Sequence, residues 1–150
     1  MRFEHSVIVE ASVEEVRAFL DDVQHAADCL PGVEDVKHIE GDTYEGRMKI
    51  RIGPLALNVA SRANIAKSDP DHWRVTGEGR DTRVGAGVKA SLDAAWTAIT
   101  PTTTEVTMAA DVTFSGRLGE LGQPLIKRKA DQLMKEFAGN LSSALAAARP

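Results

Sequence analysis

The chain has 150 residues, of which 43% are hydrophobic and 27% charged, and its formal net charge is −4. This length supports one domain with a substantial core, and the acidic balance gives no overall attraction to nucleic acid. The single cysteine, Cys29, excludes an internal disulfide and any cysteine-cluster metal site, and no apolar run approaches the roughly 18 residues of a membrane span. Because the N-terminus also lacks a signal-peptide pattern, we expect a cytoplasmic protein in which residues 1–150 form a single domain.

The N-terminal segment is predicted to form a strand followed by two short helices. Residues 3–10 alternate between apolar and polar side chains, which is typical of a strand with one buried face. Ser12 and Glu15 then form a capping-box pattern, in which each side chain binds the backbone amide of the other residue, so a helix begins here. A second short helix is expected over residues 23–30, and Pro31-Gly32 ends it.

The middle of the chain is predicted to be almost entirely strand. Apolar and polar residues alternate through most of this region, and Gly53-Pro54 joins two alternating segments into a hairpin. A second turn is expected at Ser68-Asp-Pro-Asp71, because proline fixes its backbone and the aspartates cap nearby amides. The expected strands are residues 33–39, 43–52, 55–66, 73–80, 88–99 and 105–114.

The last part of the chain is predicted to be one long helix. Pro124 suits the first turn of such a helix, where its missing amide costs nothing. Apolar residues recur at multiples of four along one stripe: Leu121, Leu125, Leu133, Phe137, Leu141 and Leu145. A sheet of about seven antiparallel strands must curl, and its concave face needs a cover. We therefore expect an α+β fold in which a curved antiparallel sheet wraps around the long C-terminal helix, with two short helices after the first strand.

The inward-facing rows of the predicted strands mix large side chains with small ones. In the hairpin around Gly53-Pro54, the buried parity combines Met48 and Leu57 with Gly46 and Ser61. In one account, the small residues make room for bulky residues of the helix. In the other, they leave a cavity. Because an unfilled void costs about 24 cal/mol per Å³, the second account predicts that a ligand occupies the space.

Four short motifs occur in a fixed order along the chain. They are Cys29-Leu-Pro-Gly32, Ile52-Gly-Pro54, Gly77-Glu-Gly79 ahead of a glycine-rich loop, and Gly116-Arg-Leu-Gly-Glu-Leu-Gly122. Together with the order of the predicted elements, these motifs resemble the carbon monoxide dehydrogenase G-subunit (CoxG) family of the START-like (SRPBCC) superfamily. The resemblance covers nearly the whole chain, and it implies the helix-grip fold.

The resemblance also implies a function. Members of the family usually accompany molybdenum hydroxylases such as CO dehydrogenase, and they bind a hydrophobic molecule such as a quinone or lipid in the grip cavity. By this analogy the protein is a non-catalytic accessory protein that assists membrane recruitment, electron-acceptor delivery or maturation of the enzyme. Its partners would be the subunits of that enzyme and, peripherally, the inner face of the cell membrane. No covalently bound cofactor and no nucleic acid are expected, and the residues leave the oligomeric state open, a homodimer included.

Twelve residues are predicted to line the ligand site. Most share the inward parity of the strands, two lie in the short helices, and two lie on the stripe of the long helix. They are Phe19, Cys29, Met48, Ala63, Trp73, Val75, Leu92, Trp96, Met108, Phe114, Leu133 and Phe137. Thioethers and flat aromatic rings suit a conjugated or isoprenoid ligand, although they suit an ordinary core equally well. Cys29 is similarly either a thiol at the cavity mouth or a small buried hydrophobe.

Two surface features have competing interpretations. Basic residues share the outward parity of one hairpin: Arg47, Lys49, Arg51 and Arg62. These residues, like Lys127-Arg-Lys129, fit either docking onto anionic lipid or an acidic partner, or an ordinary solvated face. The glycine-rich segment 80–87 is expected to be a flexible loop and a gate over the cavity. The four histidines lack metal-ligand spacing, so no metal site is predicted.

Two alternatives to the carrier function stay open. An enzyme of the polyketide cyclase-like type would need an acid–base group facing the cavity, and only Tyr44 has the right parity, with no partner beside it. The inward rows contain almost no ionisable groups, so we predict no catalytic residue. A structural assembly factor with a filled core is the other alternative, and it predicts no extractable ligand.

Overall fold

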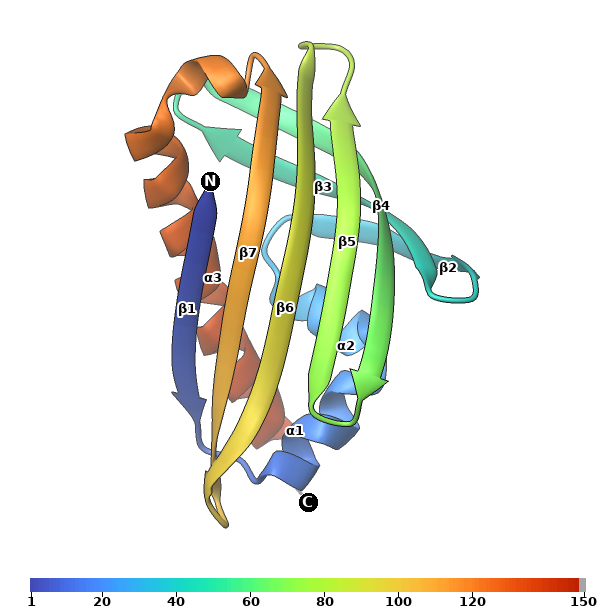
Figure 1. Ribbon diagram of the computed structural model, residues 1–150, viewed down its shortest axis with the longest axis vertical. Coiled ribbons are helices and arrows are strands. Elements are labelled where there is room, and N and C mark those ends of the chain that lie inside the picture. Colours follow the sequence, from blue (N-terminus) through green and yellow to red (C-terminus); the bar gives the residue numbers. More distant parts are fainter. Residues whose placement is uncertain (149–150) are drawn as a thin grey trace.

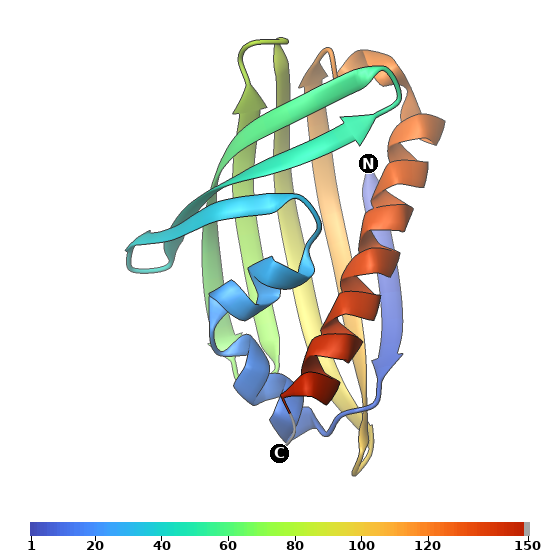
Figure 2. The same ribbon diagram turned by 180° about the vertical axis from the view of Figure 1, so that it is seen from behind.

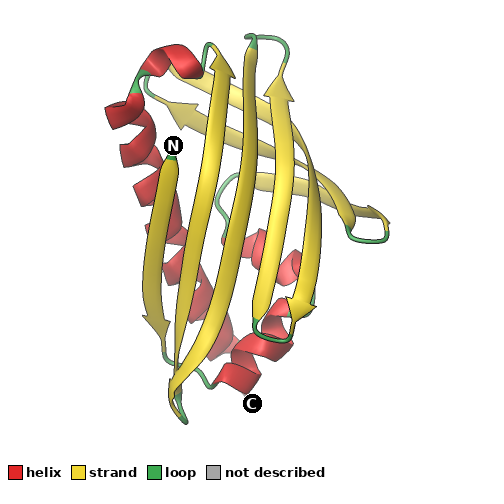
Figure 3. Ribbon diagram, viewed as in Figure 1, coloured by secondary structure: helices red, strands yellow, loops and turns green. Residues whose placement is uncertain are grey.

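The computed structural model describes residues 1–148, which form one antiparallel sheet, two short helices and one long helix (Figure 1, Figure 3). The elements are β1 (Arg2–Val9), α1 (Val13–Leu20), α2 (Val23–Cys29), β2 (Val33–Glu40), β3 (Thr43–Ile52), β4 (Leu55–Asp69), β5 (His72–Asp81), β6 (Ala86–Thr100), β7 (Thr103–Gly116), the 3-10 turn η1 (Gly119–Leu121) and α3 (Gln123–Ala147). The predicted order of elements is confirmed.

The strands lie in the order β1-β7-β6-β5-β4-β3-β2. From β2 to β7, each strand is followed by its neighbour in the sheet, whereas β1 lies beside β7 at one edge. The sheet curls strongly, so β2 and β3 run at a steep angle to β5, β6 and β7 (Figure 1). Figure 2 shows α3 lying across the concave face, with α1 and α2 near its C-terminal end. The predicted architecture, a curved antiparallel sheet around a long C-terminal helix, is confirmed.

Local chemistry sets the ends of the short helices. The Ser12 hydroxyl accepts a hydrogen bond from the Glu15 amide at 3.1 Å, and the Glu15 carboxylate accepts one from the Ser12 amide at 3.1 Å. This confirms the predicted capping box. Gly32 then turns the chain into β2 with a φ of +81°. A Cβ atom there would lie 2.1 Å from the Lys49 carbonyl oxygen, so only glycine fits.

The strands differ from their predicted ranges mainly at their ends. The hairpin of β3 and β4 turns at Gly53-Pro54 as predicted, but β4 continues past residue 66 to Asp69. Similarly, β6 begins at Ala86, so the predicted loop 80–87 shrinks to a tight turn. These strands extend beyond their alternating sequence pattern because the additional residues still form hydrogen bonds with the neighbouring strand.

The apolar core falls into two clusters along the concave face. The first surrounds Trp73 and Trp96 and includes Leu141 and Leu145 of α3. The second lies where the tip of the β3–β4 hairpin meets η1 and the start of α3, and its buried members are Ile52, Leu55, Leu57, Val59, Ala86 and Leu118. The stripe of α3 contacts both clusters, because Leu125 packs against the second and Phe137 against the first.

The long helix begins close to its predicted start. Its first residue is Gln123, and Pro124 occupies the first turn. Its 25 residues include charged side chains on the exposed side, such as Lys127 and Arg128. Among residues 1–148, no helix is both long and apolar enough to span a bilayer.

Candidate ligand-binding cavity

A cavity of about 340 Å³ lies between the concave face of the sheet, α2 and α3. Its lining comes from α1, α2, β2 to β7 and α3, and it is almost entirely apolar. The rings of Trp73 and Trp96 meet edge to face across two neighbouring strands, with their centroids 5.9 Å apart. Small-molecule sites in proteins typically measure about 300–1,000 Å³, so the cavity lies within their size range.

Eight of the twelve predicted site residues lie in the wall of this cavity. They are Met48, Ala63, Trp73, Val75, Leu92, Trp96, Met108 and Phe137. The alternation of the strands brings the first seven onto one face, and α3 supplies the eighth. Their role in ligand binding stays a prediction.

The other four predicted residues lie outside the lining. Phe114 packs against the second core cluster, because the inward row of β7 extends beyond the cavity. Phe19 stacks on the His25 ring with a centroid separation of 4.7 Å. Leu133 is half-buried on α3, and Cys29 is buried at the end of α2.

Sequence reasoning missed the wall formed by α2 and β2. Val23, Ala26, Ala27 and Leu30 line the cavity from α2 and the residue after it. Their spacing of three, four and seven residues marks one face of a helix, which is the signal that would have identified them. From β2, Val36 also contributes to the lining, although its strand shows a poor alternating pattern.

Some small inward residues permit close packing, and others leave space for the cavity. A Cβ atom on Gly79 would lie 2.6 Å from Val59 Cγ1 and 2.9 Å from Ser61 Oγ. This glycine therefore permits the close approach of β4 and β5 where the sheet curls. In contrast, Ala63 and Ala94 lie in the cavity wall, where larger side chains would occupy the space.

The cavity wall holds few polar side chains. Tyr44 and Ser61 have the inward parity and make no side-chain hydrogen bond to any described residue. Trp96 Nε1, in contrast, donates a hydrogen bond to the Pro70 carbonyl oxygen at 3.1 Å. Within residues 1–148, no three His, Cys, Asp or Glu side chains converge as metal ligands would. The arrangement suits the binding of an apolar molecule better than acid–base chemistry.

The sequence matches one known family over nearly its whole length. Residues 6–146 match the family described as the G-subunit of carbon monoxide dehydrogenase (CoxG). The chain belongs to the CoxG family. A comparison with curated proteins finds no match.

Solved structures with the same fold include a protein of the START superfamily. A conserved protein from Geobacillus kaustophilus has a TM-score of 0.90 at 20% identity, with 98% of this chain and 96% of that chain covered. A START superfamily protein from Mycobacterium smegmatis has a TM-score of 0.74 at 12% identity, with 99% of each chain covered. The Zhui aromatase/cyclase from Streptomyces sp. R1128 has a TM-score of 0.70 at 16% identity, with 97% and 93% covered. These likenesses show the START-like helix-grip fold.

The segment Cys29-Leu-Pro-Gly32 connects α2 to α3 through one hydrogen bond. Cys29 is only 3% exposed, and its carbonyl oxygen accepts a hydrogen bond from Asn140 Nδ2 of α3 at 2.9 Å. Burial raises the pKa of the Cys29 thiol, and the nearby Asp28 carboxylate raises it further. The thiol is therefore uncharged at neutral pH, as in a structural cysteine rather than a nucleophile.

The glycine-rich segment 80–87 does not cover the cavity. The buried Asp81 carboxylate accepts hydrogen bonds from the Asn58 amide at 2.9 Å and the Arg83 amide at 3.1 Å. The Gly85 carbonyl oxygen accepts one from the Arg117 amide at 2.9 Å. No residue of this turn lines the cavity, and Ala86 packs into the second core cluster. The prediction of a gate at residues 80–87 is therefore wrong.

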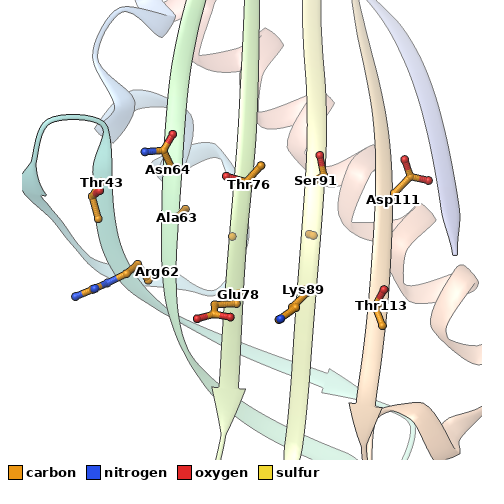
Figure 4. A pocket seen from close by; sticks show the side chains of 12 residues that line it. Thr43, Arg62, Ala63, Asn64, Thr76, Glu78, Lys89, Ser91, Asp111 and Thr113 are labelled. Carbon is orange, nitrogen blue, oxygen red and sulfur yellow. The ribbon is translucent and has the colours of Figure 1, made fainter.

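The outer face of the sheet carries charges of both signs. Arg62 pairs with Glu45 on the neighbouring strand, and Lys49 lies 3.5 Å from the Glu34 carboxylate. Across β4, β5 and β6, Arg62, Glu78 and Lys89 follow one another in register. Figure 4 shows these three side chains in a shallow depression of about 520 Å³. The alternating signs favour a solvated face over a basic docking patch.

Proposed function

We propose that this member of the CoxG family is a non-catalytic carrier that binds an apolar molecule, such as a quinone or another lipid-like compound, in its cavity. One observation carries the proposal, which is the 340 Å³ apolar cavity inside an otherwise packed fold. Without a ligand, these apolar walls lack the dispersion contacts that a packed core makes. A bound apolar ligand restores those contacts.

The chemistry of the wall supports the non-catalytic part of the proposal. Tyr44 is the one ionisable side chain of inward parity in the lining, and no general acid or base lies in hydrogen-bond contact with it. Aromatase and cyclase activity belongs to a neighbour in fold that is 16% identical, and likeness at that level extends to the fold alone.

Membership of the CoxG family supports a place beside a molybdenum hydroxylase of the CO dehydrogenase type. In this proposal the protein works in the cytoplasm, at the inner face of the cell membrane. There it assists membrane recruitment, electron-acceptor delivery or maturation of the enzyme. A quinone-like cargo connects these roles, since such a molecule moves between the membrane and a redox enzyme.

The first experiment is extraction of the purified protein with organic solvent, followed by mass spectrometry against a mock purification. An isoprenoid or lipid species at one equivalent per chain is the expected result. The protein is also incubated with menaquinone and ubiquinone analogues before a second extraction. Blank extracts in both arms would exclude the carrier function and favour an assembly factor with a filled core.

A second experiment tests the partner. Purified CO dehydrogenase is passed over the immobilised protein, and retention of the enzyme is expected. The control is a variant with Arg47 and Arg51 exchanged for glutamate, since these two basic side chains have no ion pair among the described residues. Equal passage of the enzyme through protein-loaded and empty resin would contradict the partnership.

A further inference from the structure

A second hollow lies against the outside of the cavity wall. It measures about 420 Å³, and its lining comes from the α1–α2 junction, β2 and β3. Val23, Val36 and Tyr44 line both this hollow and the apolar cavity. These three side chains therefore form the partition between the cavity and the outer hollow.

The partition lies in the wall of the cavity that the edge strand β2 forms. β2 is an edge strand, and its pairing with β3 is interrupted between Glu34 and Lys37 and again between His38 and Glu40. At the first interruption Asp35 has a φ of +56°, a left-handed conformation that non-glycine residues rarely adopt. The other walls are strands with neighbours on both sides and the 25-residue α3. Because β2 has a strand on one side alone and its pairing with that strand is interrupted, it can move away from α2 with little loss of sheet hydrogen bonds.

The two sides of the partition differ in chemistry. The inner side ends at Trp96, Val106 and Leu141, all of which are buried and apolar. The outer hollow presents the exposed carboxylates of Asp21 and Asp22. A molecule that spans the partition therefore needs an apolar body and a polar end.

Tyr44 lies at the boundary between these two environments. Its ring contacts the His38 ring with a centroid separation of 5.0 Å, and it packs against the first core cluster. Its hydroxyl makes no hydrogen bond to a described residue. This hydroxyl can therefore bind the polar end of a molecule whose apolar body fills the cavity.

The charges of the outer hollow restrict the kind of polar end. Two carboxylates repel an anion. Lys67 Nζ lies 3.8 Å from the Asp21 carboxylate and offsets part of its charge, whereas the Asp22 carboxylate has no Lys or Arg side chain in ion-pair contact among the described residues. An uncharged polar end, such as a hydroxyl or carbonyl group, meets no such repulsion.

We infer that the partition of Val23, Val36 and Tyr44 is the ligand portal, and that the ligand is an amphiphile with an uncharged polar end. The apolar end lies toward Trp96, and the polar end is hydrogen-bonded to the Tyr44 hydroxyl. This inference rests on the proposed carrier function, and it adds the route, the orientation and the class of ligand.

The portal is tested by the rate of ligand association. Diphenylhexatriene, an apolar probe that fluoresces in apolar sites, is mixed with the protein in a stopped-flow instrument. Val36→Trp enlarges the partition, and its association rate should fall several-fold, with a smaller fall for Val36→Leu. Ile39→Trp is the matched control, because Ile39 lies on the same strand with 44% of its surface exposed. Circular dichroism checks that each variant is folded.

The possible results separate the portal from the carrier function. Equal association rates in wild type, Val36→Trp and Val36→Leu, or a fall in Ile39→Trp as large as that in Val36→Trp, would overturn the portal and leave the carrier function intact. Failure of wild type to bind the probe or the quinone analogues would overturn both.

The orientation is tested by competition for the same probe. Wild type should bind dodecanol more tightly than dodecanoate, although both have the same chain length. Relative to its effect on diphenylhexatriene, which has no polar end, Tyr44→Phe should weaken dodecanol binding about five-fold, the usual effect of one lost hydrogen bond. Tighter binding of dodecanoate, or unchanged dodecanol affinity in Tyr44→Phe, would overturn the assignment of ligand class and orientation.

Discussion

Ala63 and Ala60 lie on the same strand but on opposite faces of the sheet. Ala63 is in the cavity wall, whereas Ala60 is exposed on the outer face. Ala63→Phe should therefore fill part of the cavity and weaken binding of a menaquinone analogue by more than about ten-fold, equivalent to about 1.4 kcal/mol. Ala60→Phe should bind as wild type does. Fluorescence titration measures both affinities, and equal affinities in the two variants would place the ligand elsewhere.

Asp81 gives the protein a defined response to acid. The hydrogen bond from the Asn58 amide, assisted by Arg83, holds the pKa of the Asp81 carboxyl below its ordinary value. The folded state therefore binds this proton less readily than the unfolded state. The resulting stability is present above the unfolded pKa and is lost as the pH falls through the folded pKa.

The Asp81→Asn variant tests this response. Its melting temperature should fall less than that of wild type when the pH is lowered from about 5 to about 3. Asp111→Asn is the control, because Asp111 forms only an exposed ion pair with Arg2, and such pairs contribute little. Parallel melting curves for wild type and Asp81→Asn over this range would contradict the prediction.

At the scale of elements, two glycines should respond in opposite ways to the same substitution. Gly79→Ala places a Cβ atom 2.6 Å from Val59 Cγ1 at the curl of β4 and β5 and should cost about 1–3 kcal/mol. Gly139→Ala meets nothing within 4 Å on α3 and should stabilise the protein by about 0.8–1 kcal/mol. Urea unfolding measures both changes, and a Gly79→Ala variant as stable as wild type would show that the curl tolerates a side chain.

The sequence predicts elements well where short-range chemistry controls them. The capping box at Ser12 and Glu15, the turn at Gly53-Pro54 and the start of α3 near Pro124 each depend on a few adjacent residues. The segment 80–87 was predicted wrongly because its conformation depends on distant partners. The Asn58 amide donates a hydrogen bond to Asp81, and the Arg117 amide donates one to the Gly85 carbonyl oxygen. The glycine content of the segment does not predict either contact.

The site was predictable along the strands and at Phe137 on the stripe of α3. Period-two alternation places Trp73 and Met108 on the concave face, but it does not say where the cavity ends, so Phe114 was included although it packs in the second cluster. The wall of α2 was missed because its small residues, such as Ala26 and Ala27, give a weak helical stripe. Which side chains surround a cavity depends on how the elements pack together.

At the scale of the whole molecule, the cavity couples ligand binding to stability. A ligand that binds only the folded chain stabilises it by about 2.7 kcal/mol at a concentration 100 times its dissociation constant. For a protein of this size we expect a rise in melting temperature of about 5–10 °C. Differential scanning fluorimetry with the menaquinone analogue measures this rise, and Ala63→Phe should reduce it. An equal rise in that variant would indicate binding outside the cavity.

The pairing of β1 with β7 also affects how the chain can fold during synthesis. β1 precedes the other strands of the sheet in the sequence, yet within residues 1–148 it pairs with β7 alone, with Phe3 opposite Ala110. The amino group of Met1 donates a hydrogen bond to the Val112 carbonyl oxygen at 2.6 Å, so this contact forms only after β7 has been synthesised. A nascent chain that ends before β7 cannot bury Phe3 and Val9 in the native way. Such contacts across most of the sequence are typical of slow folding, and the sheet is completed only after β7 has been synthesised.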